Sequence, residues 1–109
     1  MVSVDDVFDL LQSEERRYAL YYLDAQDDPV SIDELAEEVA KMKDDARADD
    51  PSHSDVRHYK IELQHSELPK ADEATFVDYD SDEGLVRLTA EPPEFEVILS
   101  IAEVVEKPL

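Results

Sequence analysis

A group of hydrogen-bond donors occurs in the segment 54–70 and continues into the strand that follows. Arg57, Lys60 and Gln64 are spaced three and then four residues apart, which places them on one face of a helix. Arginine, lysine, glutamine and histidine donate to phosphate oxygens and to the edges of bases, so the group predicts contact with nucleic acid. The residues predicted to contact DNA are Arg57, His58, Lys60, Gln64, Lys70 and Arg87.

Two other interpretations of this segment are weaker. The donors could form a solvated helix face that pairs with nearby acids. The histidines could bind a metal, but His58 and His65 lie seven residues apart, about 10 Å along a helix axis, which is too far to bind one ion. A site that combined His53 with Asp55 or Glu62 would need convergent geometry, so no metal is predicted.

Enzymatic chemistry is not indicated. The sequence has no cysteine, and therefore neither a thiolate ligand nor a thiolate nucleophile. Its carboxylates are too many and too evenly spread to nominate a catalytic pair. No glycine-rich phosphate loop occurs. We therefore expect no enzyme, no catalytic residue and no cofactor.

The charge balance is extreme. Thirty acidic residues against ten basic ones give a net charge of −20 over 109 residues. Such charge is typical of disorder, but 42% of the residues are apolar and recur periodically, which predicts a folded domain. Dispersed acids with little lysine are typical of surfaces adapted to molar salt, where the Debye length is about 3 Å. An ordinary acidic protein and a nucleic-acid mimic are the alternatives.

The apolar runs are too short to cross a bilayer, and the N-terminus MVSVDDVFDLL is acidic where a signal peptide would be basic. We therefore expect a soluble, cytoplasmic protein with no membrane partner.

The segment after the donor group has the pattern of a β-hairpin. Alternating side chains in FVDYD and LVRLT give each strand one buried face. Gly84, the only glycine, lies where the turn needs a positive φ. A helix that runs directly into a tight hairpin is how a winged helix-turn-helix ends, so the helix over 54–66 is the predicted recognition helix. Pro69 predicts either a kink near Leu68 or a new turn that runs to Ala74.

Apolar spacing and caps predict the preceding helices. A short helix has one stripe of Val4, Val7, Phe8 and Leu11, and Ser13 is the N-cap of a second helix. Ser31 and Glu34 form a capping box for a third. Val30 could add one short strand. The order predicts an α+β fold: a winged helix-turn-helix with three to four helices, a β-hairpin wing and a C-terminal helix.

Residues 1–109 are predicted to form a single domain, with the core and wing over 4–89. The C-terminal helix, 94–107, has more apolar side chains than one small core can bury. We expect it to pack against another copy, in a homodimer formed through the first and last helices.

The segments ERRYALYYL, VSIDELAEEVA and LQHSELPKADEA, followed by VDYD and LVRLT, resemble the small uncharacterised winged-helix domains of haloarchaea. Those domains are regarded as transcriptional regulators and are related in shape to ArsR-type repressors. The resemblance covers about Leu11–Thr89. Ala71 stands where the family commonly has leucine, and Thr75 where it commonly has glycine. It implies a DNA-binding regulator from a halophilic archaeon.

We therefore predict a regulator of transcription that binds double-stranded DNA as a homodimer, with the helix over 54–66 in the major groove. The acids at the predicted wing tip, Asp80, Asp82 and Glu83, stand where a wing that grips phosphate would have lysine or arginine. The alternative is a winged-helix module that binds a protein partner and not DNA.

Overall fold

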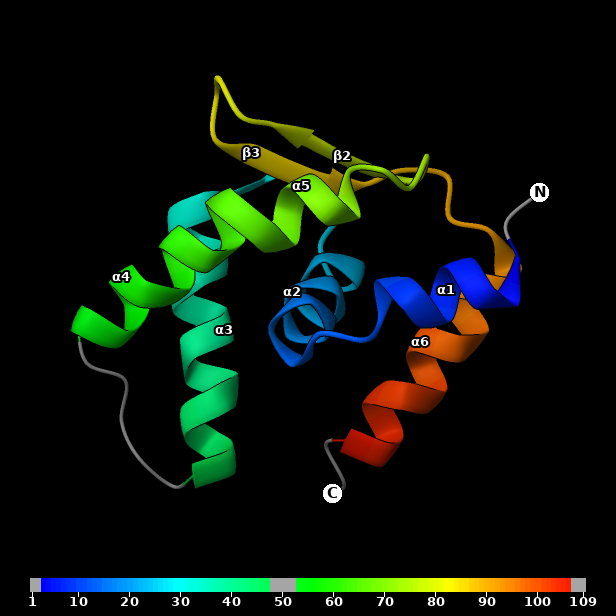
Figure 1. The fold of residues 1–109 in the computed structure, drawn as a ribbon, viewed down its shortest axis with the longest axis horizontal. Helices are drawn as coiled ribbons and strands as arrows, with labels where there is room; N and C mark the ends of the chain where they lie inside the picture. The colour runs from blue at the N-terminus through cyan, green and yellow to red at the C-terminus, as the bar shows by residue number, and fades with distance from the viewer. Residues whose placement is uncertain (1–2, 48–52, 107–109) are drawn as a thin grey trace.

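The computed structural model describes residues 3–47 and 53–106 and has an α+β fold, in which helices lie under and around a small sheet (Figure 1). The helices, in chain order, are α1 (Val4–Leu10), α2 (Glu14–Asp24), α3 (Ile32–Arg47), α4 (His53–Glu62), the π-helical turn η1 (Leu63–Glu67), α5 (Leu68–Ala71) and α6 (Pro93–Glu106). The strands are β1 (Val30–Ser31), β2 (Val77–Asp80) and β3 (Leu85–Leu88). No described helix combines the length and the apolar character needed to cross a membrane.

Serine side chains begin the early helices. Ser3 forms a capping box with Asp6 at the start of α1. Ser13 accepts a hydrogen bond from the backbone N–H of Arg16, and Ser31 accepts one from Glu34. The predicted caps at Ser13 and Ser31 are therefore confirmed. These bonds satisfy N–H groups that have no partner inside the helix.

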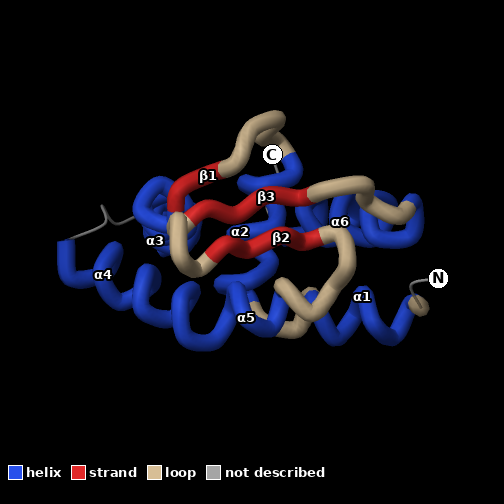
Figure 2. Tube along the Cα trace, turned by 90° about the horizontal axis from the view of Figure 1, so that it is seen from above, coloured by secondary structure: helices blue, strands red, loops and turns tan. Residues whose placement is uncertain are grey.

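The three strands form one antiparallel sheet in the order β1-β3-β2 (Figure 2). The predicted hairpin and the predicted short strand at Val30 are both confirmed, since Val30 pairs with Val86 and Tyr79 pairs with Val86 from the other side. Gly84 has φ +66°, as the turn required. Its carbonyl accepts a hydrogen bond from the N–H of Ile32 at 2.9 Å, which ties the hairpin to the start of α3.

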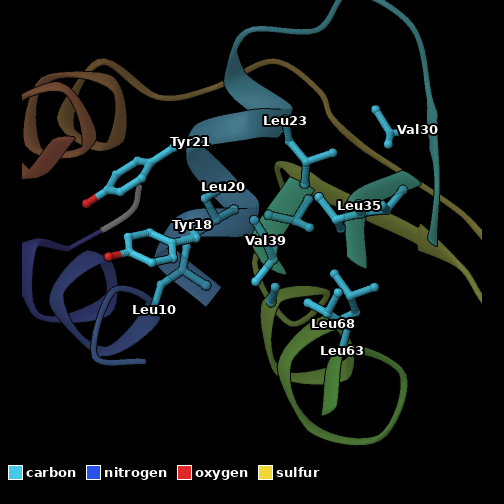
Figure 3. Packing of buried hydrophobic residues seen from close by; sticks show 14 of the residues in the cluster. Leu10, Tyr18, Leu20, Tyr21, Leu23, Val30, Leu35, Val39, Leu63 and Leu68 are labelled. Carbon is cyan, nitrogen blue, oxygen red and sulfur yellow. The ribbon is translucent and has the colours of Figure 1, made fainter. Parts of the chain in front are cut away.

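The core lies where α2, α3 and the α4–α5 segment meet beneath the sheet. Leu63 and Leu68 lie next to each other in it, on the side that faces Val39 of α3 (Figure 3). Leu20 on α2 and Leu35 on α3 are also fully buried. Because α3 and α4 pack closely, the orientation of α4 is fixed by this core.

The predicted stripe on the first helix is only half correct. Val7 and Leu11 are buried, together with Leu10, but Val4 and Phe8 are exposed. The side of α1 that carries Val7 and Leu10 therefore faces the core, and α1 packs against α6. On α6, Phe95 and Leu99 are buried and four large apolar side chains remain exposed. The end of the predicted 94–107 helix falls at residue 107, outside the described residues. Residues 48–52, between α3 and α4, also lie outside the described residues.

A pair of carboxyl groups joins the end of α2 to the segment before α6. Glu91 is hydrogen-bonded to Asp24, and its Oε2 atom is buried without a hydrogen-bond partner among the described residues. Burial, together with the hydrogen bond to Asp24 and its charge, raises the pKa of Glu91 from 4.5 to about 7. The folded protein therefore retains a proton that the unfolded chain releases.

This pair makes the contribution of Glu91 to stability depend on pH. Because the folded pKa is raised, the contribution is complete below pH 4.5 and is lost as the pH rises through about 7. We expect Glu91→Gln to increase the free energy of unfolding at about pH 8, relative to the wild type, and to have little effect near pH 4.5. Urea denaturation across this range measures the difference. Glu94→Gln, an exposed change of the same charge, is the control, and parallel pH profiles for all three proteins would contradict the assignment.

Candidate nucleic-acid interface

None of the described residues of α4 and η1 that are fully exposed is acidic, although the partly exposed Glu62 lies at the edge of this side, 3.9 Å from His58. The side chains that point to solvent recur at helical spacing. We call this set the α4 face; it consists of Arg57, His58, Ile61, Gln64 and His65. In a chain with thirty acidic residues, a run of exposed positions without an acid contrasts with the rest of the surface.

Three of the six residues predicted to contact DNA lie on the α4 face: Arg57, His58 and Gln64. Among the lysines and arginines whose side chains the structure describes, Arg57 alone forms no ion pair with a described acid. His58 lies 3.9 Å from Glu62, a neighbour on the same helix. Arg57 is thus the charged group of this face with the least competition from the protein itself.

The other three predicted contacts are not part of the α4 face. Lys60 points toward α3, where its Nζ lies 2.6 Å from Asp33. Lys70 lies 2.9 Å from Asp9 of α1, and that hydrogen bond raises the pKa of Lys70. Arg87 lies 3.7 Å from Asp78 on the neighbouring strand. Each of these cations has an exposed carboxylate within reach, so the six residues do not form one positive ridge.

Sequence reasoning left Ile61 and His65 out of the predicted set, although a signal for both was present. Position 61 is four residues after Arg57, and 65 is four residues after 61, so the helical period places all three on one side. Ile61 has no hydrogen-bond donor in its side chain, so a pattern of donors does not reveal it. An exposed isoleucine can contact a thymine methyl group, which is part of base recognition in the major groove.

One of the acids at the turn of the β2–β3 hairpin has a structural role. The Oδ1 atom of Asp80 accepts hydrogen bonds from the N–H groups of Asp82 at 3.0 Å and Glu83 at 3.1 Å. An aspartate in this position stabilises the turn by mimicking a backbone acceptor. Asp80 therefore stabilises the turn whether or not a ligand binds. Asp82 and Glu83 are exposed acids beside the strand end.

Arg16 and Arg17 form ion pairs with acids that are distant in the sequence. Arg16 reaches Glu67 of η1, and Arg17 reaches Glu106 of α6 through two hydrogen bonds of 2.9 and 2.7 Å. Both arginines also donate to carbonyl groups at the end of α1. The two guanidinium groups hold helices together and are partly or fully buried, so they do not add to the α4 face.

Within residues 3–47 and 53–106, no three histidine, aspartate or glutamate side chains are arranged to hold a metal ion. Among the described side chains, the α4 face offers hydrogen-bond donors, one apolar side chain and one guanidinium group that forms no ion pair with a described acid.

Comparison with known proteins gives a family and no activity. A family model described as a domain of unknown function, DUF7344, matches residues 8–87, a range that includes α2, the whole α4 face and most of the hairpin. No curated protein and no solved structure matches the chain. Because the match covers most of the 109 residues, the chain belongs to the DUF7344 family of domains of unknown function.

Proposed function

We propose that the protein is a winged helix-turn-helix regulator of transcription that binds double-stranded DNA with the α4 face. The order α2, β1, α3, α4, β2, β3 and the sheet order β1-β3-β2 support this fold, in which α3 and α4 are the helix pair and the hairpin is the wing. The observation that carries the proposal is the α4 face itself, a set of five exposed side chains that includes no acid and has one partly exposed carboxylate, Glu62, at its edge, on a protein of net charge −20.

The residues of the α4 face supply the contacts that distinguish bases. Arginine donates two hydrogen bonds to guanine, glutamine pairs with adenine, and an apolar side chain contacts the thymine methyl group. Arg57, Gln64 and Ile61 are these three types. In molar salt the release of counterions from phosphates contributes little, because log K falls by about 0.9 per phosphate contact for each decade of salt. A DNA-binding protein adapted to a salt-rich cytoplasm therefore depends on base contacts and on shape.

We also propose that the protein binds DNA as a homodimer. Exposed large apolar side chains are concentrated on α1 and α6, which pack against each other at the end of the molecule away from α4 (Figure 1). On α6 their spacing of four, three and one residues places them on one helix face. The exposed apolar residues of α1 and α6 are Val4, Phe8, Val97, Ile101, Val104 and Val105. A dimer formed there leaves both α4 faces free, and joining two weak sites raises the overall affinity.

Binding to a randomised pool of labelled duplex DNA in molar KCl tests the function. Repeated selection should enrich a preferred sequence, and fluorescence anisotropy then gives its affinity. We expect Arg57→Glu to weaken binding to the enriched duplex by about 10- to 100-fold, since a lost bidentate base contact costs about 1–3 kcal/mol. Lys41→Glu makes the same change in charge on the exposed side of α3 and should alter affinity by less than about 2-fold. Equal losses in both variants would remove Arg57 from the interface.

A protein-binding module is the second candidate, and one observation favours it. Lys60, Lys70 and Arg87, which would contact phosphates, each lie beside a carboxylate. Each pair would have to break before its lysine or arginine could contact a phosphate. This lowers the free energy gained from the contact, although an exposed ion pair contributes only about 0–1 kcal/mol. Failure of the wild type to enrich any duplex sequence, at low as well as at molar KCl, would support this candidate and overturn the DNA proposal.

A further inference from the structure

A π turn interrupts the helix that carries the α4 face. The N–H of Leu68 donates to the carbonyl of Leu63, five residues back, where an α-helix would use the carbonyl four residues back. Gln64 and His65 lie inside this turn, whereas Arg57 and His58 precede it. The π turn therefore sets the angle between the two halves of the α4 face.

The apolar pattern shows why the extra residue in the turn is needed. Leu68 follows Arg57 by eleven residues, which is about three turns of an uninterrupted α-helix, so Leu68 would point to solvent beside Arg57. Instead it is 1% exposed and lies beside Leu63 in the core (Figure 3). Pro69, which has no N–H to continue a regular helix, lies at the beginning of α5, where proline is tolerated.

A buried ion pair holds the turn against the first two helices. Glu67, the last residue of η1, lies 3.5 Å from Arg16, and the two residues are 8% and 7% exposed. The hydroxyl of Ser13 donates to the other carboxylate oxygen of Glu67. The same guanidinium donates to the carbonyls of Leu10 and Asp9, the latter at 2.9 Å. Glu67 thus accepts hydrogen bonds from Ser13 and Arg16, and Arg16 donates to acceptors on both α1 and η1.

We propose that Arg16 and Glu67 are positioning residues for the α4 face: they hold the π turn, and through it the orientation of Gln64 and His65 relative to Arg57. The effect of the pair on DNA binding rests on the proposed function. Its effect on the π turn does not. A buried pair often adds little net stability compared with apolar residues of equal size. The role that we assign to the pair is therefore the geometry that it specifies and not a net gain in stability.

The structural part is tested without DNA, by amide hydrogen exchange of the wild type and Glu67→Gln. Glutamine keeps the size of the side chain but leaves the charge of Arg16 without its partner. We expect exchange at the Leu68 N–H, which makes the π-type hydrogen bond, to become about 10-fold faster, while the N–H groups of β3 change little. Glu73→Gln, a change of an exposed acid just after α5, is the control. Unchanged exchange at Leu68 would overturn the proposal.

The functional part uses the duplex enriched by selection. In Glu67→Gln we expect discrimination between bases to fall by about 10-fold at the positions sensitive to Gln64→Ala, with the salt dependence of binding unchanged, because phosphate contacts are not altered. A mere loss of folded protein would lower binding to all sequences equally. If Glu67→Gln does not fold, Arg16→Lys, which keeps the charge but cannot bridge the α1 carbonyls and Glu67 together, takes its place with the same expected results. Absence of DNA binding by the wild type would remove the proposed function and leave the exchange test to decide the role of the pair.

Discussion

Ile101→Glu should convert the protein from a dimer to a monomer in molar KCl. Ile101 is 59% exposed and occupies the middle of the apolar side of α6, between Val97 and Val104. In a symmetric dimer each substitution appears twice, so two carboxylates would enter the same apolar contact. A charge buried there without a partner costs several kcal/mol, which is more than a contact of modest size can offset.

The exposed apolar area is large enough for such a contact. Each of the six exposed apolar residues of α1 and α6 is about half exposed or more, and the largest apolar patch on a typical monomer covers about 300–600 Å². A stable interface buries about 800 Å² on each partner, part of which comes from the polar rim. The rim of this surface includes exposed acids on the same helices, among them Asp5, Glu94 and Glu96. Two copies, each of net charge −20, repel one another at low ionic strength.

Sedimentation velocity over a series of KCl concentrations measures the expected dimer. The wild type should change from monomer to dimer as salt rises, because the Debye length shortens from about 10 Å at 0.1 M to about 3 Å at 1 M. Ile101→Glu should remain a monomer throughout, and Gln26→Glu, which adds the same charge at an exposed position after α2, should behave like the wild type. A wild type that stays monomeric in molar salt would contradict the dimer. An Ile101→Glu protein that still dimerises would place the interface elsewhere.

Local signals in the sequence were enough to predict much of the fold. Ser13 and Ser31 could be assigned as caps because a cap depends on residues within one turn. Gly84 could be assigned to the turn of the hairpin because only a residue without a Cβ tolerates its positive φ readily. The strand at Val30 followed from its position before a capped helix. In each case the determining residues are close in the sequence.

The partners of the charged side chains could not be predicted, because they depend on the tertiary arrangement. Arg16 and Glu67 are 51 residues apart, and Arg17 and Glu106 are 89 residues apart. Helical spacing assigned Lys60 to the predicted DNA-binding set, but spacing cannot show that Asp33 lies opposite it. The helix was therefore predicted correctly, whereas the ion pairs that separate Lys60 from the α4 face could not be predicted.

The π turn was missed for a different reason. Pro69 was recognised as incompatible with a regular helix, and a kink or a new turn was predicted near Leu68. The five-residue interval between the buried Leu63 and Leu68 was the signal for a π turn, since residues at that interval do not share a face in an α-helix. The burial of Glu67 has no local signal either, because a carboxylate is rarely buried unless it is paired and its partner, Arg16, lies 51 residues away in the sequence.

Replacement by alanine should lower the stability of the monomer strongly at the phenylalanine of α6 and hardly at all at the phenylalanine of α1. Phe95 is 0% exposed, and its ring centroid lies 4.4 Å from that of Phe76, which precedes β2. Phe95→Ala should lower the free energy of unfolding by about 3–5 kcal/mol, a large part of the 5–15 kcal/mol typical of a domain. Phe8 is 55% exposed, and Phe8→Ala should change the stability of the monomer by no more than about 0.5 kcal/mol.

Urea denaturation measures both variants at one KCl concentration, and at a protein concentration where the wild type is monomeric, so that association does not add to stability. Phe8→Ala should instead weaken the dimer seen by sedimentation, because Phe8 belongs to the exposed apolar residues of α1 and α6. If both substitutions lower the free energy of unfolding of the monomer equally, Phe8 is buried in solution and α1 packs differently. If Phe95→Ala costs less than about 1 kcal/mol, α6 is not anchored to the sheet through Phe76, and the surface proposed for the second copy loses its support.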